Sequence, residues 1–407
     1  MMCTLCVGAL VLAMGGHAHA DAETARFEQD RFGIGLWVDP PMDDQADARY
    51  KEIAEANFTF VIGGFGAHTP EQVARQLELC GKYGLKAVVR VQGYAEDQLP
   101  DSPACWGYTI KDEPSAADFP DIAAKVRAIR EARPGKLGYI NLFPSYASED
   151  QLGTPSYEAH VEQYVETVDP DVLSMDHYPR FGPKIDGRDN YCNDLGVMRE
   201  YALRKNVPFW NFFNIMPFGL NTDPTEAQLR WQIFTSIAYG AKGVMYFCYY
   251  TPAGGQFPKG GAIIRCDGSR TEHYYQARRI NEQVKHLGPT LMALTSTGVY
   301  RVAPGDDPAK VLHDTPITAL ERAAYDPEFD LLVGVFRHKD GRRAVMLNNY
   351  MFAYCQWPTV TFDVPASEVL EVDPWSGKAV NVRDDSPAMD GLQLSLNAGS
   401  GRLFLLP

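Results

Sequence analysis

Three features are missing from this 407-residue sequence, and each absence disfavours a class of function. No long basic run is present and the net charge is −14 at pH 7, which argues against nucleic acid or an anionic membrane as a partner. This charge balance suits an enzyme with a neutral or cationic substrate. No G-x-G-x-x-G motif follows the first expected strand, which ends in Asp39-Pro-Pro41, so a dinucleotide-binding fold is disfavoured.

Metal-ligand spacing is missing as well. After the N-terminal segment there is no C-x-x-C motif, no His-x-His pair and no carboxylate cluster with ligand spacing. We therefore expect neither a metal nor another cofactor. One or two disulfides would suit an oxidising compartment, but spacing does not define their pairing. Free buried thiols fit Cys80 and Cys248 at least as well.

Residues 1–20 form a separate segment. An apolar run from Cys3 to Met14 precedes Ala18-His-Ala20, which is an A-x-A cleavage pattern. The run is too short to span a bilayer, and no Lys or Arg precedes it, as one normally does in a signal peptide. We expect a signal peptide over residues 1–20 and a secreted or periplasmic protein without membrane insertion.

From residue 32 onward, short apolar runs typical of strands alternate with segments of helical periodicity. Eight such strand–helix units predict a parallel sheet closed into a (β/α)8 TIM barrel of the α/β class. After a long helix over 273–294, short strands separated by turn residues predict an antiparallel β-sandwich. We expect the catalytic barrel over residues 21–294 and the C-terminal β-sandwich over residues 295–407. The expected barrel strands are 32–39, 58–65, 85–91, 106–110, 137–142, 171–179, 207–215 and 243–250.

The segment Trp106-Gly-Tyr-Thr-Ile-Lys-Asp-Glu-Pro114 places two adjacent carboxylates at the end of the fourth expected strand. The C-terminal ends of barrel strands carry catalytic residues. Proline favours extended geometry at Glu113, and strand alternation then directs Asp112 and Glu113 to opposite sides. The structural alternative is that one of them caps a helix starting near Ser115.

The ends of the other expected strands gather carboxylate, amide and aromatic side chains. Such a set suits a carbohydrate, because polar groups bind sugar hydroxyls and aromatic rings cover the apolar ring faces. Hydrolysis of a glycosidic bond needs two carboxyl groups, for which we select Glu113 as the acid and Asp176 as the second. Asp176 also fits a substrate-positioning role. Further candidates for substrate binding are Asp39, Trp37, Arg90, Asp112, Asn141, His177, Tyr178, Trp210, Asn211 and Tyr246. Among these, His177, Trp210 and the tyrosines also fit structural roles.

Four motifs occur in order: the Asp112-Glu-Pro114 segment, Asn141-Leu-Phe-Pro144, Asp176-His-Tyr-Pro179 and Tyr239-Gly-Ala-Lys-Gly-Val-Met-Tyr-Phe247. Together they resemble the TIM-barrel glycoside hydrolases of clan A, in a β-galactosidase-like branch, over residues 32–294. The resemblance implies an acid/base Glu at the end of strand four, which matches Glu113. The clan's Asn before that Glu is replaced here by Asp112.

The resemblance also implies a nucleophilic Glu at the end of strand seven. Here residues 209–215 read Phe-Trp-Asn-Phe-Phe-Asn-Ile, without a carboxylate. Three alternatives stay open: Asp176 replaces the nucleophile, the enzyme inverts with Asp176 or Asp39 as base, or the protein binds sugar without cleaving it. The sequence thus favours a glycoside hydrolase of oligo- or polysaccharides, with a non-catalytic carbohydrate-binding protein as the alternative.

Overall fold

The computed structural model describes residues 25–182, 184–252, 257, 259–324 and 326–407, so the expected signal peptide lies outside the described residues. Eight parallel strands form a sheet in the order β5-β4-β3-β2-β1-β10-β9-β6. A parallel bridge between Leu142 and Met175 joins the two edges, which closes the barrel and confirms the predicted fold class. The barrel strands are β1 (Gly33–Leu36), β2 (Phe60–Ile62), β3 (Lys86–Arg90), β4 (Cys105–Asp112), β5 (Leu137–Asn141), β6 (Leu173–Asp176), β9 (Phe209–Asn214) and β10 (Gly243–Phe247).

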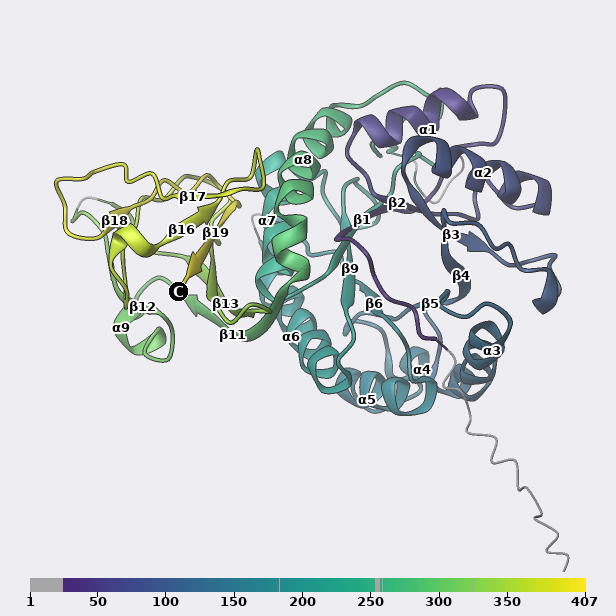
Figure 1. Cartoon of the computed structure of the whole chain (residues 1–407), viewed down its shortest axis with the longest axis horizontal. Coiled ribbons are helices and arrows are strands. Elements are labelled where there is room, and N and C mark those ends of the chain that lie inside the picture. The colour runs from purple at the N-terminus through teal and green to yellow at the C-terminus, as the bar shows by residue number, and fades with distance from the viewer. Residues whose placement is uncertain (1–24, 183, 253–256, 258, 325) are drawn as a thin grey trace, which may run out of the picture.

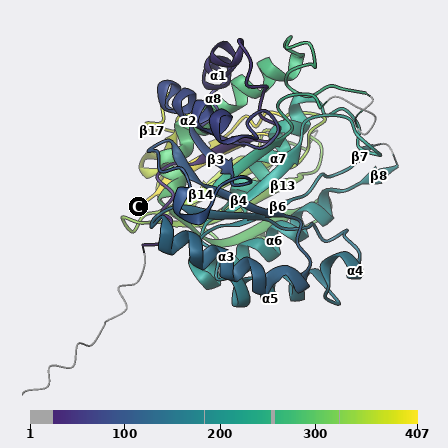
Figure 2. The same cartoon turned by 90° about the vertical axis from the view of Figure 1, so that its right-hand side faces the viewer.

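Helices surround the barrel strands, and their ends follow the capping residues of the sequence (Figure 1). Before α2, Thr69 and Gln72 form a reciprocal capping box, Pro70 occupies the first helical position, and left-handed Gly84 ends the helix. The helices are α1 (Ala46–Glu55), α2 (Pro70–Tyr83), α3 (Phe119–Ala132), α4 (Glu149–Leu152), α5 (Tyr157–Val168), α6 (Arg188–Lys205), α7 (Glu226–Ala238) and α8 (Glu272–Met292). Short α4 and a hairpin of β7 (Phe181–Gly182) and β8 (Ile185–Asp186) were not predicted; the hairpin stands out at one end of the barrel in Figure 2.

Two antiparallel sheets follow α8 and form the C-terminal β-sandwich. The larger sheet has the order β11-β13-β14-β19-β16-β17, and the smaller has the order β12-β15-β18. Its strands are β11 (Leu294–Val302), β12 (Ile317–Glu321), β13 (Leu331–His338), β14 (Arg343–Asn349), β15 (Thr359–Phe362), β16 (Leu370–Val372), β17 (Ala379–Asn381), β18 (Leu392–Gln393) and β19 (Gly401–Leu406), and α9 (Pro308–Val311) lies between β11 and β12.

The larger sheet of the sandwich is apolar on both faces. Along β13, Leu331 and Val333 belong to the core between the two sheets, whereas Leu332 and Phe336 join the core of the barrel. Alternate residues of a strand point to opposite faces, so the sheet contacts the small sheet on one side and the barrel helices on the other. Figure 1 shows α7 and α8 between the sandwich and the barrel strands. A Cβ atom at Gly334 would lie 2.5 Å from the carbonyl oxygen of Ala238 in α7, so this contact requires glycine.

The six cysteines of the described part of the chain are free thiols, so the disulfides considered above are not formed there. Cys80 and Cys248 are buried, as expected for structural thiols. None of the helices in the described ranges is long and apolar enough to cross a membrane.

Candidate active site

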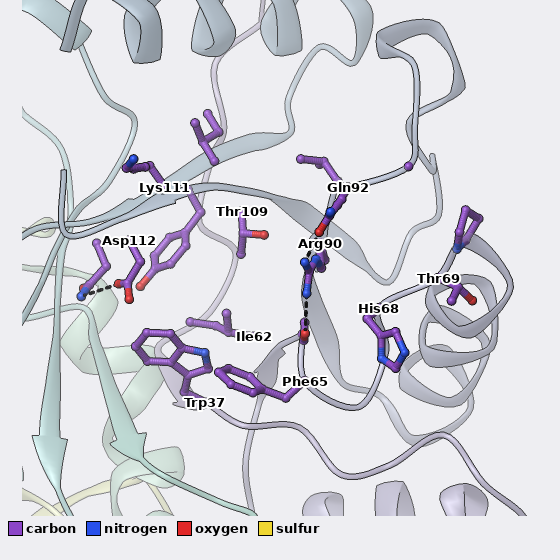
Figure 3. Close-up of a pocket in the computed structure, with 18 of the residues that line it drawn as sticks. Trp37, Ile62, Phe65, His68, Thr69, Arg90, Gln92, Thr109, Lys111 and Asp112 are labelled. Carbon is purple, nitrogen blue, oxygen red and sulfur yellow. Dashed lines mark hydrogen bonds between the residues drawn. The ribbon is translucent and has the colours of Figure 1, made fainter. Parts of the chain in front are cut away.

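Two adjoining cavities open where the barrel strands reach their C-terminal ends. The larger, which we call the carboxyl cleft, has a volume of about 1260 Å³ and is lined by Asp112, Glu113 and Asp176. The second, the arginine cavity, has a volume of about 1060 Å³ and includes Arg90 (Figure 3). Both are lined by Trp37, Phe65, His68 and Asp112, so these four residues form a shared wall. Among the described residues, no residue of the sandwich lines either cavity.

The backbone at Glu113 differs from the predicted extended geometry. Glu113 has a φ of 46°, in the left-handed region, and its N–H donates to the carbonyl oxygen of Asn141 at 2.8 Å. The β4–β5 register also shifts between Thr109 and Lys111. Strict alternation therefore ends before Pro114, and Asp112 and Glu113 both line the carboxyl cleft, which corrects the prediction that they point to opposite sides. Left-handed geometry is costly for a residue with a side chain, and such strain is typical of functional sites.

Neither of the two carboxylates caps the following helix. The turn Ala116–Asp118 begins with a capping box formed by Ser115 and Asp118, in which the Ser115 N–H donates to Asp118 Oδ2 at 3.0 Å. Lys111 lies 3.9 Å from the carboxylate of Asp118. Asp118 therefore has the capping role that was considered for Asp112 and Glu113. The latter two residues line the cleft instead.

Three carboxyl groups of the cleft, those of Asp112, Glu113 and Asp176, hold protons more tightly than exposed carboxyls do. Burial raises the pKa of Asp112 to about 7, with a further contribution from the charge of Glu113 and opposition from the Asn141 hydrogen bond. Burial raises the pKa of Asp176 well above its ordinary value, and the charges of Glu113 and Asp112 act in the same direction. Burial also raises the pKa of Glu113. The cleft can therefore carry at least one proton near neutral pH.

Asn141 positions two of these carboxyl groups. Its Nδ2 donates to Asp176 Oδ1 at 2.7 Å and to Asp112 Oδ1 at 3.4 Å. Its own Oδ1 accepts a hydrogen bond from Ser174 Oγ at 2.9 Å, and this hydroxyl lies 2.9 Å from the Tyr139 hydroxyl. The hydrogen bond from Ser174 thus fixes the orientation of the Asn141 amide, which directs its Nδ2 to the two carboxyl groups. Asn141 also lines the arginine cavity.

Asp39 lies at the edge of the cleft, but its carboxylate is fully used by the protein. Its Oδ1 accepts hydrogen bonds from the backbone N–H groups of Phe65 and Gly66. Its Oδ2 accepts hydrogen bonds from the backbone N–H of Ala67 and from Gln76 Nε2, and all four distances are 2.9 Å. The residue is 2% exposed. Asp39 therefore holds the loop after β2 in place; it also lines the cleft, and its predicted role in substrate binding or as a base stays a prediction.

We expect Asp39→Ala to lower the free energy of unfolding by about 3 kcal/mol, because it leaves several buried donors without an acceptor. Urea denaturation measures this change. Asp44→Ala, at an exposed position five residues away, serves as the control and should shift stability by less than about 0.5 kcal/mol. Equal stability of the two variants would contradict the structural role of Asp39.

His177 is 2% exposed and its Nδ1 lies 2.6 Å from Asp194 Oδ2. Its ring makes edge contacts with Tyr146 and Tyr191. His177 faces a neighbouring hollow of about 540 Å³, not the carboxyl cleft, so its predicted contact with the substrate is not supported. Tyr178, by contrast, lines both the hollow and the carboxyl cleft.

Three further predicted binding residues lie away from both cavities. Trp210 is fully buried inside the barrel, where it stacks on Trp106. Asn211 donates to the Tyr191 hydroxyl of α6 at 2.7 Å, and Tyr246 donates to Asn281 of α8 at 2.7 Å. The side chains of Asn211 and Tyr246 point outward to the helices, and Trp210 fills an interior layer below the site. Their predicted roles in substrate binding are therefore wrong.

Trp37, Arg90, Asp112, Asn141 and Tyr178 do line the cavities, as predicted. Sequence reasoning missed several aromatic side chains of the carboxyl cleft. Phe247 is the last residue of β10, so its position at a strand end could have identified it. Phe218 and Phe257 come from loops, where hydrophobic periodicity gives no signal. The aromatic residues that line the cleft and were not predicted as site residues are Phe65, Phe218, Phe247, Tyr250 and Phe257.

The protein shares its fold with glycoside hydrolases of known structure, so the resemblance expected from the sequence motifs is confirmed at the level of fold. It is similar to a GH42 β-galactosidase from G. stearothermophilus, with a TM-score of 0.62 and 8% identity over 94% of this chain and 100% of that chain. It is also similar to a β-galactosidase from Bacillus circulans sp. alkalophilus, with a TM-score of 0.57 and 9% identity over 93% of this chain and 99% of that chain. No family model and no curated protein matches the sequence.

Proposed function

We propose that the protein is a glycoside hydrolase that cleaves glycosidic bonds of an oligo- or polysaccharide. One observation carries this proposal: three carboxyl groups with raised pKa values share one aromatic-lined cleft at the C-terminal end of a TIM barrel. Catalytic residues of this fold occupy that end of the barrel. Glycoside hydrolysis requires a protonated and an ionised carboxyl group on either side of the scissile bond.

In the proposed mechanism, Glu113 protonates the oxygen of the leaving sugar. Burial favours its protonated form, which is the form that a general acid needs. Asp176 acts on the anomeric carbon as the nucleophile, or activates the attacking water as the base. Asn141 holds Asp176 through its 2.7 Å hydrogen bond. We assign no such role to Asp39, because four N–H donors already bind its oxygens.

The aromatic lining supports a sugar as the ligand. Trp37, Tyr178 and Phe247 surround the cleft next to the carboxyl groups. Tyr178 contacts Phe247 with ring centroids 5.1 Å apart, and Trp37 contacts Phe247 at 6.0 Å. Such rings cover the apolar faces of sugar rings and leave the hydroxyl groups to the polar residues.

The test of this proposal is hydrolysis by the purified chain from Asp21 onward. Nitrophenyl glycosides and plant, algal and bacterial polysaccharides form the substrate panel. Release of sugar from a polysaccharide by the wild type, strongly reduced in Glu113→Gln, is the expected result. Nitrophenol leaves with little protonation, so the nitrophenyl glycosides identify the sugar and the polysaccharides test Glu113. Failure of every substrate, combined with tight binding of an oligosaccharide, would favour the second candidate described below.

The pH profile offers a separate prediction. Because a general acid must be protonated, kcat/KM should fall on the alkaline side as the pH rises through the raised pKa of the acid. Burial and the charge of Glu113 raise the pKa of Asp112 to about 7, so the interacting pair loses its last proton there. Asp112→Asn removes that last proton and leaves Glu113 with the pKa that its own burial sets, so the alkaline limb should move to lower pH. A pH–rate series from pH 4 to 9 on both proteins measures this shift. An unchanged alkaline limb would contradict the interaction between Asp112 and the acid.

A non-catalytic carbohydrate-binding protein is the second candidate. One observation favours it: β9, the seventh barrel strand in chain order, reads Phe-Trp-Asn-Phe-Phe-Asn and supplies no carboxylate to the site. In that case Asp176 would bind a sugar hydroxyl. Calorimetric titration with oligosaccharides that the wild type leaves intact separates this candidate from the hydrolase.

We also propose that the protein acts in the periplasm or outside the cell, after removal of residues 1–20. The A-x-A pattern at Ala18-His-Ala20 supports this proposal. Expression of the full chain and N-terminal sequencing of the exported product test it. An intact N-terminus in the cytoplasmic fraction would contradict it.

A further inference from the structure

We infer that the arginine cavity binds an anionic substituent of the substrate, a carboxylate or a sulfate ester on a sugar next to the bond that is cleaved. This inference rests on the proposed function and adds the class of substrate. It also differs from the expectation of a neutral or cationic substrate, which followed from the overall charge of −14. The charge that matters is the local one at this cavity.

The guanidinium group of Arg90 is held at the wall of the cavity by neutral acceptors. Its Nη1 donates to the carbonyl oxygen of Gly64 at 3.0 Å, and its Nη2 donates to the side chain of Gln92 (Figure 3). Gly64 has a φ of 130°, a backbone conformation that favours glycine, and this conformation presents its carbonyl oxygen to the guanidinium group.

No carboxylate among the described residues forms an ion pair with Arg90, although the chain has 14 more acidic than basic side chains. Other arginines of the barrel are paired: Arg49 with Asp43 at 2.8 Å, and Arg130 with Asp171 at 2.8 Å. A guanidinium group has five N–H donors, and the two hydrogen bonds of Arg90 use two of them. Three donors and a positive charge are therefore left for a ligand.

Two other basic side chains line the same cavity, His68 and Lys111. Lys111 is only weakly engaged, since Asp118 lies 3.9 Å away and both side chains are close to half exposed. Figure 3 shows Arg90 apart from Asp112, with Trp37 and Phe65 along one wall, Lys111 on the side of Asp112 and His68 on the side of Arg90. An anion at Arg90 would thus lie near Arg90 and His68, away from the carboxyl group of Asp112.

The shared wall connects this cation to the proposed reaction. Trp37 and Phe65 line both cavities, and their ring centroids are 6.0 Å apart. Phe65 is 53% exposed, so its ring is available for a second sugar. A saccharide that places its scissile bond at Glu113 would extend its neighbouring unit along this wall towards Arg90. Carboxylates and sulfates offer paired oxygens, which match the planar donors of arginine.

Direct binding to Glu113→Gln tests the inference, because this variant should not cleave its ligand. The probes are oligouronides of galacturonate, glucuronate and mannuronate with their neutral methyl esters, and sulfated galactan oligosaccharides with their desulfated forms. Calorimetry should show at least tenfold tighter binding of one charged probe than of its neutral partner. This preference should weaken as the salt concentration rises. Preference for the uronides identifies a carboxylate, and preference for the sulfated probes identifies a sulfate ester.

Second-site variants assign the preference to the cavity. Arg90→Gln, made in the Glu113→Gln background, should remove the preference, and Arg90→Lys should retain part of it. Arg127→Gln, at an exposed position of α3, makes the same charge change and should leave the preference intact. Loss of binding to neutral probes as well would indicate a structural role for Arg90 and would overturn the inference.

These experiments test the glycosidase activity and the anion site independently of each other. Hydrolysis of a neutral substrate by the wild type, with no preference for any charged probe, would overturn the anionic substrate and keep the glycosidase. Preference for a charged probe without hydrolysis of any substrate would support the anion site and contradict the glycosidase activity. Binding of none of the probes would also overturn the anion site.

Discussion

Glu113→Gln is expected to lower kcat by about 10²- to 10⁴-fold, which is the usual contribution of a general acid. Glutamine has nearly the same shape as glutamate but cannot supply the proton that the leaving oxygen needs. Burial raises the pKa of Glu113, so the wild type carries this proton closer to neutral pH than an exposed glutamate would. Steady-state hydrolysis of the best substrate from the panel measures the effect.

Binding and stability should change little in this variant, because no described hydrogen bond of the fold involves the Glu113 side chain. Calorimetric titration and urea denaturation check both properties. Glu158→Gln, at an exposed position of α5, is the matched control and should keep full activity. Wild-type turnover in Glu113→Gln would remove Glu113 from the mechanism.

Asp176→Asn is expected to lower kcat by a factor similar to that of Glu113→Gln if Asp176 is the nucleophile or the base. The Oδ1 atom of an asparagine can still accept the hydrogen bond that Asn141 donates at 2.7 Å in the wild type, so the local geometry should persist. The lost property is the negative charge, which the oxocarbenium-like transition state requires. Kinetics should therefore show a fall in kcat with a small change in KM.

The opposite kinetic pattern would assign another role to Asp176. A raised KM with kcat unchanged would mean that Asp176 only positions the substrate. Proton NMR of the product released by the wild type then separates the two catalytic roles. Retained anomeric configuration indicates a nucleophile, and inverted configuration indicates a base.

The barrel was predictable because its signals are local and repeated. Each strand is a short apolar run, and each following helix has its own caps, such as Thr69 before α2 and Thr225 before α7. Eight repeats then define the topology with little ambiguity. The hairpin β7–β8 was not predicted, because its strands are only two residues long and no apolar alternation can develop.

The sequence predicted which strand ends form the site, but it did not predict which side chains at those ends face the cavity. Trp210 and Asn211 are neighbours on β9, yet one fills the barrel interior and the other bonds to α6. Alternation separates the two directions but does not identify which parity faces the cavity. Glu113 adds a second difficulty, because its positive φ depends on the hydrogen bond to Asn141, a residue 28 positions away in the chain. The occupied oxygens of Asp39 likewise depend on a loop that the strand pattern does not describe.

The two-sided apolar sheet of the sandwich has a consequence for how the chain gains its stability. Leu332, Phe336 and Met346 belong to the same continuous core as the barrel helices, so this face of the large sheet and the barrel helices bury each other. A shortened chain ending at residue 294 would expose this apolar surface on α7 and would tend to aggregate. Barrel and sandwich should therefore unfold together in a single cooperative transition. The C-terminal sandwich, which does not line the carboxyl cleft, would then be required for the barrel to fold and form the cleft.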